Sequence, residues 1–162
     1  MIKPGDRLPS MKLLTPSEEG PQEIDTGELF AGKTVVMFAV PGAFTPTCSA
    51  RHLPGFLDHF DDLRAKGVDE VVCLAVNDPF VLQAWARSQN SQGKVTMLAD
   101  GSGTFTQALG LELDLSTRGL GVRSQRFALI AKDGLVTHLA VEQPGGFEVS
   151  RAEAVLEALA TS

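Results

Sequence analysis

Three short apolar stretches divide the first hundred residues of the chain, at positions 34–40, 70–76 and 95–99. The first two are rich in valine, and turn-forming or polar residues border all three. Short apolar runs with β-branched residues are typical of strands buried on both faces of a sheet. The pattern therefore predicts three core strands.

Two pairs of shorter stretches predict hairpins at the ends of the chain. Residues 126–131 and 136–141 flank Lys132-Asp133-Gly134, and the Asp-Gly pair favours a tight turn between antiparallel strands. Near the N-terminus, residues 11–15 and 22–25 are separated by a segment rich in turn formers. We expect this first pair to form an N-terminal hairpin.

Helical spacing alternates with the core strands. After the first strand, apolar residues recur at three- and four-residue steps, at Leu53, Phe56, Leu57, Phe60 and Leu63. This spacing predicts a helix over about 47–65, which we expect Pro54 to kink. Asp78 and Pro79 are typical of the cap and first position of a second helix. Further helices are predicted over 104–109 and 151–159.

The order of these elements is β-α-β-α-β-α followed by β-β-α. Alternation of strands and helices favours a parallel sheet with helices on its faces, here closed by an antiparallel hairpin. This is an α/β, thioredoxin-like arrangement with an N-terminal hairpin extension and a helical insert near 101–123. We expect residues 111–123 to be irregular, and the whole of 1–162 to form one domain.

Composition narrows the function classes. Hydrophobic residues make up 43% of the 162 residues, and the formal net charge is −6. That charge argues against nucleic acid and anionic membranes as partners, because both require clustered basic residues. The first residues contain no apolar segment typical of a secretory signal, and the two cysteines fit a reducing compartment. We therefore expect a cytoplasmic protein.

Cys48 is the strongest candidate for chemistry. It follows a Pro/Gly-rich loop and falls in the first turn of the helix predicted over 47–65. Backbone N–H groups without partners and the helix dipole favour negative charge at such a point, so a thiolate is stabilised there. Cys48 is thus a candidate nucleophile near the surface, although an inert buried cysteine is the alternative interpretation.

Residues 41–56, which read PGAFTPTCSARHLPGF, resemble the active-site signature of the peroxiredoxins, and of the peroxiredoxin 5 and plant type II subgroup in particular. The stretches VCLAVND at 72–78 and RSQRFAL at 123–129 are similar to two further segments of that subgroup. The resemblance implies a thioredoxin-like fold. It also implies reduction of hydrogen peroxide and organic hydroperoxides without a metal or flavin, through a sulfenic acid on Cys48.

The resemblance also assigns roles to other residues. It places the active-site arginine immediately before Phe127, which makes Arg126 the candidate that stabilises charge and Arg123 its rival. A surface ion pair would be the ordinary interpretation of such an arginine. The Thr45 hydroxyl is expected to hold the thiol or the peroxide, with a simple turn role as the alternative.

Three residues of the signature loop, Pro41, Phe44 and Thr47, are candidate substrate-binding residues. His52 falls one helical turn after Cys48, on the same face, where it is expected to act as a base or as a hydrogen-bonding support. Arg51 is expected to lend positive charge.

Cys73 allows two interpretations. It lies 25 residues after Cys48, as a second cysteine does in plant type II enzymes, yet it sits inside a predicted buried strand. Cysteine in an apolar strand usually packs as a small hydrophobe, which is the interpretation we favour. Residues 145–151, where animal-type enzymes of the subgroup carry a resolving cysteine, contain none. We therefore expect an external thiol to resolve Cys48, with glutathione and glutaredoxin favoured and thioredoxin as the alternative.

Other functions remain to be weighed against a peroxidase. A dithiol–disulfide oxidoreductase would use the same fold, but the chain has no Cys-X-X-Cys pair. A redox sensor or holdase would use oxidation of Cys48 as its signal. The resemblance further suggests a homodimer packed near the active-site loops.

Overall fold

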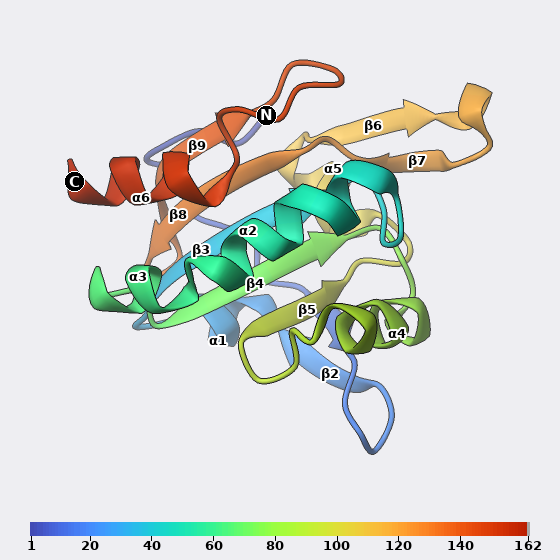
Figure 1. Cartoon of the computed structure of the whole chain (residues 1–162), viewed down its shortest axis with the longest axis horizontal. Helices are drawn as coiled ribbons and strands as arrows, with labels where there is room; N and C mark the ends of the chain where they lie inside the picture. The colour runs from blue at the N-terminus through green and yellow to red at the C-terminus, as the bar shows by residue number, and fades with distance from the viewer. Residues whose placement is uncertain (162) are drawn as a thin grey trace.

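A seven-stranded mixed sheet forms the centre of the protein in the computed structural model, which describes residues 1–161 (Figure 1). Its strand order is β2-β1-β5-β4-β3-β8-β9, and β3, β4 and β5 run parallel to one another. Strands β1, β8 and β9 pair antiparallel with their neighbours. The strands are Lys12–Thr15 (β1), Gln22–Asp25 (β2), Thr34–Val40 (β3), Glu70–Ala75 (β4), Val95–Ala99 (β5), Phe127–Lys132 (β8) and Leu135–Val141 (β9).

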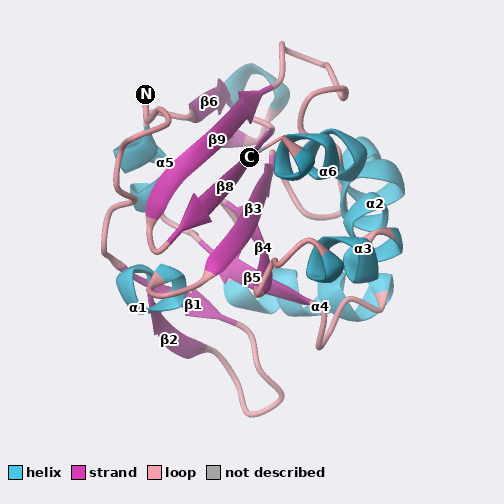
Figure 2. Ribbon diagram, turned by 90° about the vertical axis from the view of Figure 1, so that its left-hand side faces the viewer, coloured by secondary structure: helices cyan, strands magenta, loops and turns pink. Residues whose placement is uncertain are grey.

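Helices cover both faces of the sheet, as Figure 2 shows from the side. One face packs against α2, α3, α4 and α6, and the other against α1 and α5. The strands in the middle of the sheet are almost wholly buried because helices lie on both sides of them. The helices are Thr26–Phe30 (α1), Leu53–Asp58 (α2), Phe60–Ala65 (α3), Pro79–Gln89 (α4), Thr104–Leu109 (α5) and Ala152–Ala160 (α6).

The predicted strands and hairpins are confirmed, and so is the thioredoxin-like α/β class. The N-terminal hairpin joins the main sheet through a pairing of Leu14 with Ala99 on β5. The second hairpin turns at Asp133 and Gly134, which both have positive φ angles of 51° and 76°. The Asp78 side chain accepts a hydrogen bond from the Val81 N–H at 2.9 Å and caps α4, as its sequence position predicts.

Two expectations are wrong in detail. Residues 111–123 are not irregular, because Glu112–Leu115 (β6) and Gly121–Ser124 (β7) pair as a separate two-stranded sheet. The helix expected over 47–65 divides at His59, between α2 and α3, rather than kinking at Pro54. Pro54 instead lies in the first turn of α2, directly after the π-helical turn Cys48–His52.

The short helix α1 has no counterpart among the predicted elements. Its cap is recognisable, since the Asp25 carboxylate accepts hydrogen bonds from the N–H groups of Gly27 and Glu28. Five residues are too few for apolar periodicity to reveal a helix.

None of the helices in residues 1–161 is both long and apolar enough to cross a membrane.

Candidate active site

Cys48 lies in the first turn of a helix that follows β3, as predicted. Helical backbone begins at Pro46, and the Thr45 carbonyl accepts the first hydrogen bond, from the Ser49 N–H at 3.0 Å. The turn then widens to π geometry, with the Leu53 N–H donating to the Cys48 carbonyl. Pro54 has no N–H group, so it cannot donate the next hydrogen bond of an ordinary α-helix. The wider π-helical turn directly before it is consistent with this missing donor.

The expected surface position of Cys48 is wrong. Its exposed fraction is 0%, and it belongs to the core cluster on the face of the sheet that packs against α2, α3, α4 and α6. The periodicity that places a cysteine at a helix start says nothing about what covers the sulfur. With no exposed surface at this residue, a reactant needs a local opening of the turn to reach Sγ.

Arg126 makes the direct contact with the sulfur. Its Nη2 donates to Cys48 Sγ at 3.2 Å. The two residues meet because β8 runs antiparallel to β3, with Phe127 opposite Ala39, so the start of one strand lies beside the end of the other. A permanently charged guanidinium in this position can stabilise negative charge on the sulfur and on the oxygen that leaves during attack on a peroxide.

His52 supports Arg126 rather than the sulfur. Its Nε2 lies 3.0 Å from the Ser150 carbonyl oxygen, which can only accept, so Nε2 carries the proton. Its Nδ1 then accepts from Arg126 Nη1 at 2.8 Å. Burial, and secondarily the charge of Arg126, lower the pKa of His52 from 6.5 to about 3. His52 is therefore neutral in the folded protein at neutral pH.

The neutral state of His52 predicts a pH-dependent loss of stability. Below about pH 6.5 the unfolded chain binds a proton at His52, whereas the folded protein does so only near pH 3. The free energy of unfolding should thus be unaffected by this group above pH 6.5. Below pH 6.5 it should decrease by about 1.4 kcal/mol for each pH unit. Urea unfolding at about pH 7.5 and about pH 5 measures this, and His52→Gln should reduce the loss by about 2 kcal/mol.

The matched control for this measurement is His59→Gln. His59 is partly exposed and its Nδ1 lies 3.1 Å from the Asp62 carboxylate, so this change replaces a histidine outside the buried cluster of His52. That variant should not reduce the loss between the two pH values. An equal loss in His52→Gln and in the unmodified protein would contradict the neutral state assigned to His52.

The Thr45 hydroxyl is part of the same loop, but it is directed to the backbone. It donates to the Gly42 carbonyl at 2.6 Å, which leaves its lone pairs to accept a hydrogen bond from the O–H of a bound peroxide. Thr47 is half-buried and makes no side-chain capping bond at the turn that it precedes. Phe44 is 55% exposed and has a positive φ of 62°, so its ring projects from the loop.

Arg123, the rival to Arg126, has a different role. Its Nε donates to the Leu120 carbonyl at 2.8 Å and its Nη1 to the Pro41 carbonyl at 3.2 Å. It therefore ties the signature loop to β7 and the turn before it. Arg51 is exposed, and its guanidinium lies 4.9 Å from the centre of the Phe147 ring.

Cys73 is wholly buried on β4, paired with Phe38 on one side and Met97 on the other. Burial, with a smaller contribution from the charge of Cys48, raises the pKa of the Cys73 thiol well above its ordinary value. Both cysteines are free thiols. Cys73 is therefore a neutral, strand-bound thiol, and it is a poor nucleophile in this conformation.

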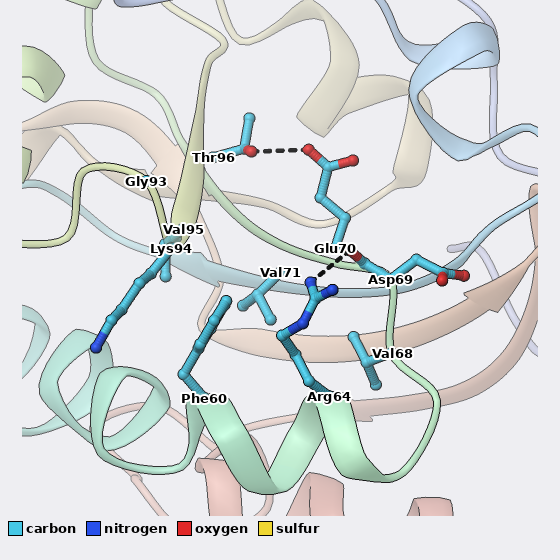
Figure 3. Close-up of a pocket in the computed structure, with 10 residues that line it drawn as sticks. All are labelled: Phe60, Arg64, Val68, Asp69, Glu70, Val71, Gly93, Lys94, Val95 and Thr96. Atoms are coloured by element: carbon cyan, nitrogen blue, oxygen red, sulfur yellow. Dashed lines mark hydrogen bonds between the residues drawn. The ribbon is translucent and has the colours of Figure 1, made fainter.

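A cavity of about 240 Å³ lies at the amino ends of β4 and β5, away from this site (Figure 3). The Arg64 side chain in it donates to the Asp69 carbonyl, and the Glu70 carboxylate accepts from Thr96 and Lys33. These polar groups are thus engaged with one another. Among residues 1–161, no group of three or more His, Cys, Asp or Glu side chains could hold a metal ion.

Sequence reasoning missed the group that orients His52. This is the backbone carbonyl of Ser150, which comes from the loop between β9 and α6. A backbone acceptor has no residue-type signal, so only the folded chain reveals it. Sequence reasoning also missed the contact between the single tryptophan and the turn, in which Trp85 Nε1 donates to Ser49 Oγ at 2.9 Å.

Comparisons with known proteins place the chain in a family. The redoxin family model matches residues 3–156. Peroxiredoxin-2C of Oryza sativa subsp. japonica is 53% identical over 156 residues, which is 96% of each chain. Peroxiredoxin-2B of Arabidopsis thaliana is 53% identical over 138 residues, which is 85% of each chain. The crystal structure of reduced Prx3 from Vibrio vulnificus with H2O2 superposes with a TM-score of 0.94 at 53% identity, covering 98% of this chain and 99% of that one.

The fold and the Cys48–Arg126 pair define a thiol-based oxidoreductase with a thioredoxin-like fold. Within that class the chain belongs to the redoxin family, and among its members to the peroxiredoxins that resemble the plant type II enzymes. It is a thiol peroxidase. Membership of this family favours the peroxidase function over the dithiol oxidoreductase and the non-enzymatic sensor that the sequence left open.

Proposed function

We propose that the protein reduces hydrogen peroxide and organic hydroperoxides through a sulfenic acid on Cys48 that an external thiol resolves. The single observation that carries the proposal is the contact of Arg126 Nη2 with Cys48 Sγ at 3.2 Å. One similar structure supports the substrate class, because the Vibrio vulnificus protein described above was solved with H2O2. That ligand belongs to the relative, and its use here is part of the proposal.

The chemical step needs only the groups at this site and the peroxide. The Cys48 thiolate attacks the terminal peroxide oxygen, an S–O bond forms and the O–O bond breaks. The departing alkoxide or hydroxide takes up a proton to give an alcohol or water, and the sulfur is oxidised by two electrons to the sulfenic acid. Arg126 stabilises the negative charge as it passes from sulfur to the leaving oxygen. Thr45, with Pro41, Phe44 and Thr47, is assigned to contact the peroxide.

The reducing step is assigned to glutathione with glutaredoxin, with thioredoxin as the alternative. A first thiol displaces water from the sulfenic acid to form a mixed disulfide, and a second thiol releases reduced Cys48 as an external disulfide forms. The neutral, buried state of Cys73 supports an external thiol over an internal one. Because Cys48 is also buried, this step requires an opening of the turn over 48–52.

Cys73→Ser should therefore keep turnover with glutathione and glutaredoxin. It should lower stability by about 1–3 kcal/mol, since a hydroxyl replaces a wholly buried thiol. Peroxidase assays with glutathione/glutaredoxin and with thioredoxin, supplied separately, measure turnover in both proteins. Mass spectrometry after one equivalent of peroxide and dimedone should find the adduct on Cys48.

The contrary result is equally definite. A dominant Cys48–Cys73 disulfide in the mass spectrum, together with lost turnover in Cys73→Ser, would show an internal two-cysteine cycle. Turnover with thioredoxin alone would reassign the reductant and leave the peroxide step intact.

The proposal includes a homodimer that packs near the active-site loops. Phe44 and Phe80 are 55% and 68% exposed, on the segments that follow β3 and β4. A hydrogen bond from the Ala43 N–H to the Asn77 side chain, at 2.9 Å, joins these segments. Exposed apolar side chains on adjoining loops favour a covering partner, here a second copy.

The cytoplasmic location stays a prediction, and two of the similar plant proteins are named chloroplastic.

A further inference from the structure

The active-site arginine and three other residues, Glu142, Ser150 and His52, form a closed ring of hydrogen bonds. The Glu142 N–H donates to the Arg126 carbonyl at 2.9 Å. The Glu142 carboxylate accepts from the Ser150 N–H at 2.8 Å and from its hydroxyl at 2.7 Å. The Ser150 carbonyl accepts from His52, which in turn accepts from the Arg126 guanidinium. The ring therefore includes Arg126 twice, through its backbone carbonyl and through its side chain.

We propose that Glu142 is a positioning residue for peroxide reduction: it fixes the Ser150 carbonyl, which orients His52 and so holds the Arg126 guanidinium against Cys48. The inference rests on the role proposed above for Arg126. Glu142 itself touches neither the sulfur nor the peroxide site in this arrangement, so its effect must pass through the other members of the ring.

The ring of hydrogen bonds is buried, which explains why one carboxylate can hold its members in place. His52 and Ser150 are wholly buried, and Glu142 is only 8% exposed. Burial of a carboxylate costs free energy unless hydrogen bonds from the protein replace those it made to water. Glu142 Oε2 alone accepts three, one from the Glu148 N–H and two from the N–H and hydroxyl of Ser150. Charge-assisted bonds of this kind are stronger than neutral ones and hold their partners in one geometry.

Glu142 also places an aromatic ring beside the same arginine. Phe147 belongs to the loop that the carboxylate holds, and its ring lies edge-on to His52 with centroids 5.2 Å apart. The Arg126 guanidinium carbon is 5.9 Å from the centre of that ring. Contact with an aromatic face restricts the guanidinium further. Release of the loop would therefore loosen Arg126 on two sides.

The ring and the bare charge of Glu142 predict effects of opposite sign. A negative charge near a thiol opposes its ionisation, so removing that charge should favour the Cys48 thiolate. Loss of the ring should instead let Arg126 move away from Sγ and disfavour the thiolate. The direction of the change in Cys48 ionisation thus separates a positioning role from simple electrostatics.

Glu142→Gln in the full chain is the decisive variant, because it keeps the shape and removes the charge-assisted bonds. The pH midpoint of Cys48 alkylation by iodoacetamide should rise by about half a unit or more. The stopped-flow rate constant with H2O2 should fall about tenfold, by analogy with the loss of an outer partner at a metal site. The matched control is Glu148→Gln, which removes an equal charge from an exposed side chain of the same loop and should change neither value.

Two more variants keep the test decisive. Ser150→Ala removes only the hydroxyl bond and should shift both values in the same direction by less, which provides the test if Glu142→Gln does not fold. In an Arg126→Ala background, Glu142→Gln should shift the alkylation midpoint no further. An unchanged or lowered midpoint in a folded Glu142→Gln or Ser150→Ala, or a rise that persists without Arg126, would overturn the positioning role. Neither result would touch the peroxidase function, which depends on Cys48.

Discussion

The Cys48→Ser protein will show no peroxide reduction above the rate without enzyme. A serine hydroxyl stays un-ionised at neutral pH and is a far weaker nucleophile than a thiolate, so no sulfenic acid can form. The change removes little volume from the core and keeps Arg126 in place, so the fold should survive. Consumption of H2O2 with glutathione and glutaredoxin measures the loss, and thermal unfolding verifies that the protein is folded.

The matched control is the other cysteine. Cys73→Ser makes the same atomic change at an equally buried position, on a strand instead of a helix start. It should retain turnover, which separates loss of the nucleophile from loss of a buried thiol. Substantial peroxidase activity in Cys48→Ser would remove the central assignment.

Arg126→Ala should lower the rate constant with peroxide by about 10²-fold or more, as loss of a single oxyanion donor does in other enzymes. The physical reason is the loss of the 3.2 Å contact from Nη2 to Cys48 Sγ, which favours both the thiolate and the leaving oxygen. The pH midpoint of Cys48 alkylation should rise in parallel. Stopped-flow kinetics with H2O2 on the folded variant measure the first effect, and iodoacetamide alkylation measures the second.

Two further substitutions sharpen that experiment. Arg126→Lys keeps the charge but has no planar fork, so it cannot serve His52 and Cys48 together and should rescue the rate only in part. Arg118→Ala removes a charge from the exposed turn between β6 and β7 and should leave the rate unchanged. An unchanged rate in a folded Arg126→Ala protein would exclude Arg126 from the site.

The burial of Cys48 gives the proposed reducing step a structural requirement, because an external thiol must reach a sulfur without exposed surface. Opening the turn over 48–52 would separate Trp85 from Ser49 Oγ and Gln89 from the Ser49 carbonyl. The turn that carries Cys48 is thus held by α4, and in the proposed cycle this contact would have to loosen before a large reductant could reach the sulfur.

Much of the fold could be predicted because local patterns carry it. The apolar runs of β3, β4 and β5 and the Asp78 cap each depend on neighbouring residues, so their spacing is visible in the chain. The hairpin of β6 and β7 was missed because each strand has only four residues and the pair packs outside the main sheet. The burial of Cys48 was missed because local spacing does not show what covers a helix start.

The sequence by itself determined the helix start at Cys48 and, through the family signature, the choice of Arg126 over Arg123, and it predicted Cys48 as the nucleophile. All of these are encoded in short stretches whose residues act on their immediate neighbours. Only the tertiary structure decided that His52 is a neutral support for Arg126, that the Ser150 carbonyl orients it, and that Glu142 closes the ring. These contacts join residues up to 98 positions apart, partly through backbone atoms, and they exist only because the sheet places the start of β8 beside the end of β3.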